Sequence, residues 1–246
     1  MAPEQFAGDQ RAWMQQTVAG LAAANAWKQA AVALEEGYAA FAPLHDRINL
    51  EAIVFALVIA DISETSGQRG YSGFGAIPGY IMTVYGAAND YTLSRVKAAT
   101  VHELHHNLAA AAGIGMGGNT NIMTTTVGEY MIGEGLAESF AAELYGADKV
   151  GFYVTDFDPS RLAETKCIIH DGLDRSGFDV VRGYIFGDEI AAQYNLPAAG
   201  VPAYAGYALG YQIVQAYLKR TGKTVVEATL VPAREIIAES RFFEEL

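Results

Sequence analysis

Three of the chain's five histidines lie within one segment of five residues, His102-Glu103-Leu104-His105-His106. If this segment is helical, His102 and His106 are one turn apart and project from the same face. Two imidazoles placed in this way can bind one Zn²⁺ ion. Glu103 then lies about 100° further round the helix, beside the metal rather than on it. That is the place for a general base acting on a zinc-bound water, so the segment predicts a hydrolytic zinc site.

A second predicted helix, from about 127 to 145, offers the carboxylate that this site still needs, because catalytic zinc centres use three protein ligands. Glu134 and Glu138 share one face of this helix, and the glycine on either side of Glu134 removes side chains that would keep the two helices apart. We predict that Glu134 is the third ligand. We expect Glu138 to accept a hydrogen bond from a ligand histidine and so fix its tautomer. Glu129 is the weaker alternative ligand, because it lies about 140° from Glu134 on an ideal helix.

Further side chains are candidates for supporting roles. His105 flanks the ligand pair on the side opposite Glu103, and we expect it to pack behind the site, with metal ligation as the alternative. Tyr207 and Tyr211, one turn apart in the segment GYALGY, are catalytic candidates that could stabilise the oxyanion of a tetrahedral intermediate. His170 is the third candidate for that role. The alternative for both tyrosines is a core or interface position.

These motifs together resemble a bacterial family of zinc-dependent proteases, within the thermolysin-like gluzincin superfamily. Its members pair an HEYHH-like motif with an EGLAE motif, and this chain has HELHH followed by GEGLAESFAAELYG. Further matches are FGD at 186–188, GYALGYQIVQAYL at 206–218 and AESRFF near the C-terminus. The resemblance therefore runs from about residue 70 to the end of the chain.

The resemblance implies a role for each matching residue. His102, His106 and Glu134 would bind one zinc ion per chain, Glu103 would be the base, and Glu138 would be the carboxylate behind a ligand histidine. The sequence departs from the pattern in spacing, because 27 residues separate His106 from Glu134. Thermolysin-like enzymes use a shorter gap, and here a glycine-rich stretch, interpreted as a connector, occupies part of it.

The elements that must position these residues are mostly helical. Residues 10–42 predict two helices, the second from Ala26 to Ala40 with Asn25 as its cap. The apolar stretch 48–62 predicts a buried strand. Residues 75–86 predict a strand at a sheet edge, because Pro78 cannot donate a hydrogen bond to a neighbouring strand.

One long predicted helix, starting at Asp90 or Thr92 and ending at Gly113, carries HELHH. Further helices are expected after Pro202 and from about Pro232 to Phe243.

The predicted fold class is α+β and zincin-like, with a small mixed sheet whose edge strand lies over the active-site helix and a mainly helical C-terminal half. We expect residues 1–246 to form a single catalytic domain. Within it, 1–47 form N-terminal helices, 48–112 the strands and the HExxH helix, and 126–246 a helical subdomain that carries the third ligand.

Composition excludes several classes of protein. The chain has 16 basic and 28 acidic residues and a net charge of -12, which argues against nucleic acid as a partner. Its single cysteine, Cys167, excludes an internal disulfide and a multi-cysteine metal cluster. The longest apolar run, 52–60, is shorter than the roughly 20 residues of a membrane span. Because the N-terminus lacks the pattern of a secretory signal, we expect a cytoplasmic location.

The leading hypothesis is thus a zinc metallopeptidase acting on a peptide or protein substrate. An edge strand just before the active-site helix could bind an extended peptide by strand addition. One alternative is a non-catalytic zinc-containing module that binds peptides or a partner protein, although such a module has no need of Glu103. The other alternative is a zinc hydrolase that acts on a non-peptide amide.

Overall fold

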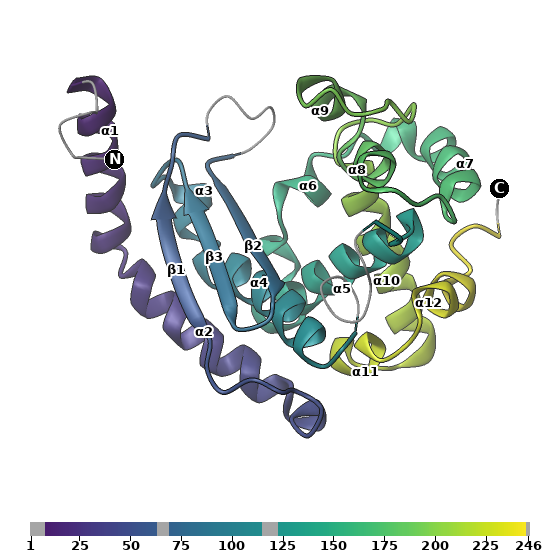
Figure 1. The fold of residues 1–246 in the computed structure, drawn as a ribbon, viewed down its shortest axis with the longest axis horizontal. Helices are drawn as coiled ribbons and strands as arrows, with labels where there is room; N and C mark the ends of the chain where they lie inside the picture. Colours follow the sequence, from purple (N-terminus) through teal and green to yellow (C-terminus); the bar gives the residue numbers. More distant parts are fainter. Residues whose placement is uncertain (1–7, 63–68, 115–122, 245–246) are drawn as a thin grey trace.

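The structure is a computed structural model that describes residues 8–62, 69–114 and 123–244. Two helices, α1 (Gly8–Ala23) and α2 (Ala26–Ala40), run along one side of a three-stranded sheet, and the C-terminal half on the other side is helical (Figure 1). The predicted α+β class, with a small mixed sheet and a mainly helical remainder, is confirmed. Most of the predicted glycine-rich connector lies outside the described residues.

The sheet contains β1 (Val54–Ile59), β2 (Tyr71–Ile77) and β3 (Tyr80–Tyr85) in the order β1-β3-β2. Strands β1 and β3 are parallel, whereas β2 and β3 are antiparallel. The prediction of one edge strand over 75–86 is wrong, because Pro78 and Gly79 form the turn of a hairpin. Gly79 has a φ of 84°, which only glycine adopts readily. The edge strand beside the HExxH helix is therefore β2, and β3 is the central strand.

Strand β1 is shorter and less buried than predicted. It lies at the other edge of the sheet, and alternate side chains from Val54 to Val58 are exposed. Tyr80 and Met82 of β3 and Phe74 of β2 are exposed as well. Strand pairing places these side chains together on one face, while the opposite face carries buried residues such as Ile81. An uninterrupted apolar sequence could not show which face is buried.

The long helix predicted to carry HELHH is divided in two. Helix α3 (Asp90–Leu93) begins at a capping box in which Asn89 Oδ1 accepts a hydrogen bond from Thr92 N at 2.9 Å. Helix α4 (Val96–Ala111) follows after a break at Ser94 and Arg95. The Arg95 guanidinium donates to the carbonyl of Asp148 at 2.8 Å, which ties the break to the segment after the next helix. Gly113, with a φ of 76°, lies just beyond the C-terminal end, as predicted.

Helix α5 (Val127–Tyr145) has the predicted bounds and lies centrally in the molecule (Figure 1). It packs against α4 and against α10 (Ala205–Thr221), α11 (Val225–Thr229) and α12 (Ala233–Ser240). A Cβ atom at Gly135 would overlap the carbonyl of Gly210, so the glycine after Glu134 admits α10. The prediction that this glycine allows α5 to approach the HExxH helix is wrong, because Gly135 lies against α10.

The start of α2 is as predicted, but Asn25 is in the left-handed conformation and makes no side-chain cap. The remaining helices are α6 (Phe152–Thr155), α7 (Leu162–Gly172), α8 (Phe178–Phe186) and α9 (Asp188–Gln193), with 3-10 turns η2 (Ala42–Leu44), η3 (Ala147–Lys149) and η4 (Pro159–Arg161). Over the described residues, no helix is both long and apolar enough to cross a membrane.

Candidate metal centre

Helices α4 and α5 bring three potential metal ligands together at the place where they pack. His102 Nε2 lies 3.2 Å from Glu134 Oε2 and also 3.2 Å from His106 Nε2. His106 Nε2 lies 3.3 Å from Glu134 Oε2. All three side chains are buried, and together they form a group that could hold a metal ion. The i, i+4 spacing on α4 places the two imidazoles on one face, as predicted.

The size of this triangle of donor atoms can be compared with what zinc requires. Bonds of about 2.0–2.1 Å in a tetrahedral site place neighbouring ligand atoms about 3.3 Å apart. The three observed separations are 3.2, 3.2 and 3.3 Å. Two imidazoles and one carboxylate are also a ligand set of catalytic zinc sites, which leave the fourth position open. The residues therefore fit a zinc ion in both chemistry and spacing.

Glu138 lies one turn after Glu134 and contacts the other nitrogen of His102. Its Oε1 atom is 3.2 Å from His102 Nδ1, and its Oε2 atom accepts a hydrogen bond from Gly151 N at 2.9 Å. A carboxylate at Nδ1 favours the tautomer with the proton on that atom, which leaves the Nε2 lone pair free for a metal. The backbone of Gly151 in turn fixes the carboxylate.

Glu103 is buried and lies against the edge strand β2. A Cβ atom at Gly73 would overlap the Glu103 carboxylate, and one at Gly75 would overlap the Glu103 carbonyl. Two glycines in β2 therefore allow the strand to lie directly on α4. Burial raises the pKa of Glu103, and the nearby His102 and His106 only partly oppose this shift. A carboxyl group with a raised pKa is a better proton acceptor near neutral pH.

The buried donor side chains also shift one another's pKa values. Burial alone would raise the pKa of Glu134, but His106 and His102 lower it to about 2. Burial alone would lower the pKa of His102, but Glu134 and Glu138 raise it well above its usual value. In the metal-free protein, Glu134 and His102 therefore each favour the charged form of the other.

His105 lies on the far side of α4 from Glu103. Its Nε2 atom is 2.9 Å from Thr229 Oγ1, and its ring packs against Phe41 and Phe140. Burial lowers its pKa well below the usual value, so the ring is neutral. His105 thus links α4 to α11 within the core.

Asn107, the residue after HELHH, has a role that sequence reasoning missed. Its Oδ1 atom accepts a hydrogen bond from Gly79 N at 3.0 Å, and its Nδ2 atom lies 2.7–3.0 Å from the carbonyls of Gly75, Ile77 and Tyr80. This fully buried amide therefore fixes the β2–β3 hairpin to the HExxH helix. Asparagine is unfavourable inside a helix, so its presence after HELHH was a sequence signal that the side chain has a specific partner.

A cavity of about 690 Å³ opens onto the three donors and Glu103. Its wall includes β2 from 72 to 76, and Tyr130, Tyr153 and Tyr207. Of the two tyrosines singled out in the sequence, Tyr207 lines this cavity and Tyr211 does not. Tyr130 lies four residues before Glu134 on α5, so the helical spacing alone could have identified it.

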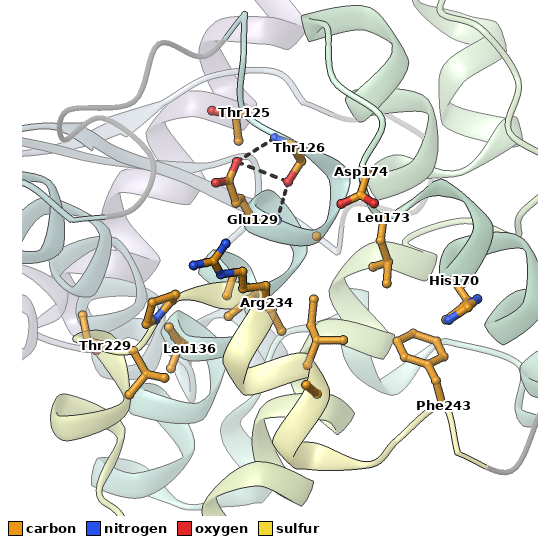
Figure 2. A pocket seen from close by; sticks show the side chains of 18 of the residues that line it. Thr125, Thr126, Glu129, Leu136, His170, Leu173, Asp174, Thr229, Arg234 and Phe243 are labelled. Carbon is orange, nitrogen blue, oxygen red and sulfur yellow. Dashed lines mark hydrogen bonds between the residues drawn. The ribbon is translucent and has the colours of Figure 1, made fainter.

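The other candidates from the sequence belong to a separate cavity of about 790 Å³. Figure 2 shows Glu129 and His170 on its wall, and neither ligand histidine lines it. Glu129 forms a capping box with Thr126, accepting hydrogen bonds from its N at 2.9 Å and its hydroxyl at 3.2 Å (Figure 2). The structure therefore places Glu129 at the start of α5, with its carboxylate used by the helix cap.

Comparison with known proteins gives the family of this chain. A family model described as "Predicted Zn-dependent protease (DUF2268)" matches residues 26–238. The chain belongs to this family. The predicted membership of a family described as zinc-dependent proteases is thus confirmed at the level of that description, and the matched range contains every residue of the candidate centre.

The chain is also similar to a protein from Bacillus subtilis (strain 168). It is the protein named "Uncharacterized protein YjfC", which is 41% identical over 197 residues. The aligned part covers 80% of this chain and 64% of that protein, so the chain spans less than two thirds of the relative's length. No solved structure gives a significant match.

Proposed function

We propose that this chain is a zinc-dependent metallopeptidase that hydrolyses peptide bonds. The observation that carries the proposal is the buried triangle of His102, His106 and Glu134, whose edges of 3.2–3.3 Å fit tetrahedral zinc. Two histidines of one helix and a glutamate of a later helix are the ligand set of gluzincins, and we assign the chain to that type, with a zincin-like catalytic domain. One zinc ion per chain is expected.

In this proposal each residue has a defined task. Zinc at this site would polarise a substrate carbonyl and lower the pKa of water. Glu103 is the general base, because it is buried beside the donors without being one of them. Glu138 holds His102 in the tautomer that leaves Nε2 free to bind.

The oxyanion of the tetrahedral intermediate needs a hydrogen-bond donor, and we assign that role to Tyr207. Burial, followed by the charge of Glu134, raises the pKa of Tyr207 well above its usual value. The hydroxyl therefore keeps its proton near neutral pH and can donate it in a hydrogen bond. Tyr207 also lines the cavity that reaches the donors, which Tyr211 does not.

A peptide substrate suits the open edge of β2. Among the described residues this strand pairs only with β3, and its residues from 72 to 76 form part of the cavity wall next to Glu103. An extended peptide could add to this edge as a further strand, with its backbone held past the metal. The glycines of β2 keep the strand close to Glu103.

The test is to measure zinc content and peptide hydrolysis in wild type, Glu103→Gln and Glu235→Gln. Glu235 is an exposed residue of α12, so its variant is a matched control for the same chemical change. We expect about one zinc per chain in all three proteins. Cleavage of a quenched-fluorescent peptide library should be lost in Glu103→Gln, lost on chelation and restored by zinc. Absence of zinc from wild type after zinc addition, or unchanged cleavage by Glu103→Gln, would contradict the proposal.

A further inference from the structure

One face of α8 presents an unusual arrangement to the cavity of the candidate metal centre. Phe178, Arg182 and Phe186 are spaced by four residues, so all three project from the same side of the helix. All three line the cavity, as does Tyr194 from the end of α9. The Arg182 guanidinium carbon lies 4.9 Å from the ring centre of Phe178, 5.5 Å from that of Phe186 and 5.8 Å from that of Tyr194.

Arg182 is not paired with any carboxylate of the described residues. Within the part of the chain that the structure describes, no hydrogen bond or ion pair holds this guanidinium, although the protein has 28 acidic residues. Arg69 and Arg161, by contrast, pair with Asp156 and Glu164. Among the described residues of the cavity wall, Arg182 is the only lysine or arginine. Three aromatic rings therefore lie near the guanidinium, whose N–H groups can donate hydrogen bonds to a ligand.

Arg182 lines the same cavity as the three donors, and Tyr130 lines it as well. Burial raises the pKa of Tyr130, the carboxylates of Glu134 and Glu103 raise it further, and Arg182 lowers it. The guanidinium and the site carboxylates therefore act on the same hydroxyl. Phe178 and Tyr194 are 36% and 48% exposed, so the aromatic cage stands at the mouth of the cavity. A group bound there belongs to a substrate residue outside the bond that is cut.

We propose that Arg182 determines specificity by binding a carboxylate of the peptide substrate, either an Asp or Glu side chain or the C-terminal carboxylate. The planar guanidinium can donate two parallel hydrogen bonds to one carboxylate, which a neutral amide cannot match. The part of this proposal that concerns cleavage rests on the proposed function. Binding of the carboxylate itself depends on Arg182 and its cage, and it can be measured separately from hydrolysis.

The experiment uses the zinc-loaded full chain and two series of fluorescent peptides. In the first series the C-terminus is amidated and one residue is either Glu or Gln, placed in turn at each position. In the second series all side chains are neutral, and the C-terminus is either a free carboxylate or an amide. Dissociation constants are measured by fluorescence polarisation in the Glu103→Gln background, so that the peptides remain uncut, and kcat/KM is measured with active protein.

Three substitutions are compared with the parent protein. Arg182→Gln removes the charge, Arg182→Lys keeps the charge without the two-pronged geometry, and Arg175→Gln is the matched control. Arg175 lies over the ring of Tyr184 and does not line the cavity. Thermal unfolding verifies that each variant is folded.

We expect the parent protein to prefer the carboxylate member of one series by about 10- to 100-fold, in line with loss of a charge-assisted hydrogen-bonded pair. Arg182→Gln should abolish this preference, Arg182→Lys should retain part of it, and Arg175→Gln should leave it unchanged. The series that shows the preference identifies the source of the carboxylate.

Parent protein that does not distinguish the members of either pair, or a preference that survives in Arg182→Gln, would overturn the proposal. Preferential binding without any cleavage would uphold the role of Arg182 and refute the metallopeptidase, whereas cleavage without preference would do the reverse.

Discussion

Replacing Glu129, Glu134 and Glu138 of α5 by alanine, one at a time, should affect zinc binding in three different ways. Glu134 Oε2 is one corner of the donor triangle, 3.2 and 3.3 Å from the two imidazole nitrogens. Glu134→Ala leaves two protein ligands where catalytic zinc sites use three, so it should remove most of the zinc affinity.

Glu138→Ala should weaken zinc binding without abolishing it. The carboxylate contacts His102 Nδ1 at 3.2 Å and therefore orients a ligand rather than binding the metal. Losses of this kind reduce metal affinity by about 10- to 100-fold, which corresponds to about 1.4–2.7 kcal/mol.

Glu129→Ala is the matched control, because its carboxylate accepts hydrogen bonds from Thr126. We expect unchanged zinc affinity and a loss of about 1 kcal/mol of stability from the broken capping box.

Competition with a chromophoric zinc chelator at pH 7 gives the three affinities, and chemical denaturation gives the three stabilities. The reasoning would be refuted if Glu129→Ala lost the metal while Glu134→Ala retained it, because α5 would then be rotated from its described position. Equal losses in Glu134→Ala and Glu138→Ala would show that Glu138 is itself a ligand.

Three other outcomes follow from named contacts. Asn107→Ala should destabilise the protein by about 2 kcal/mol or more in urea titrations, because it leaves the buried Gly79 N–H and the hairpin carbonyls without their partner; an unchanged midpoint would contradict the role of the amide. Tyr207→Phe should lower kcat by about 100-fold while Tyr211→Phe changes it little, since only Tyr207 lines the cavity; equal effects in steady-state kinetics would argue against Tyr207 as the oxyanion donor. In the metal-free protein, the pKa of Glu134 is lowered from an ordinary 4.5 to about 2. The Glu134 carboxylate therefore contributes stability that is fully present above pH 4.5 and is lost as the pH falls towards 2. The pKa of His102 is raised above its ordinary 6.5. Protonated His102 therefore contributes stability that is fully present below pH 6.5 and is lost as the pH rises through the raised pKa. Urea titrations from pH 3 to 9 should therefore show a contribution from this cluster that is greatest between about pH 4.5 and 6.5. It should be smaller in Glu134→Gln, where Glu138 still raises the pKa of His102, and identical pH profiles for the two proteins would contradict the reasoning.

The parts of the fold that the sequence could predict are those marked by local signals. Thr126 and Glu129 form the capping box that starts α5, and Gly146, with a φ of 101°, ends it. The bounds of this helix were accordingly correct. The HELHH spacing likewise needs only the pitch of one helix to bring two imidazoles together.

One of the features that were missed depends on a contact between distant segments. The break before α4 contains no glycine or proline, and it is held by Arg95 reaching the carbonyl of Asp148, 53 residues away. The hairpin turn at Pro78 and Gly79, by contrast, has a local signal in the Pro-Gly pair, but the proline was interpreted only as the mark of an edge strand. The role of Glu129 was missed for a similar reason: its spacing to Thr126 is a local capping-box signal, but the residue was considered only as a metal ligand.

The segment from 102 to 107 also explains why one short motif specifies so much of the site. Successive residues of a helix point about 100° apart, so a helix buried on all sides presents each residue to a different neighbour. His102 and His106 face Glu134 on α5, Glu103 faces the glycines of β2, His105 faces Thr229 on α11, and the side chain of Asn107 holds the hairpin. The proposed general base and the strand proposed to bind substrate are thus fixed by neighbouring residues of one helix. Loosening the hairpin at Asn107 should therefore displace β2 relative to Glu103 without altering any metal ligand.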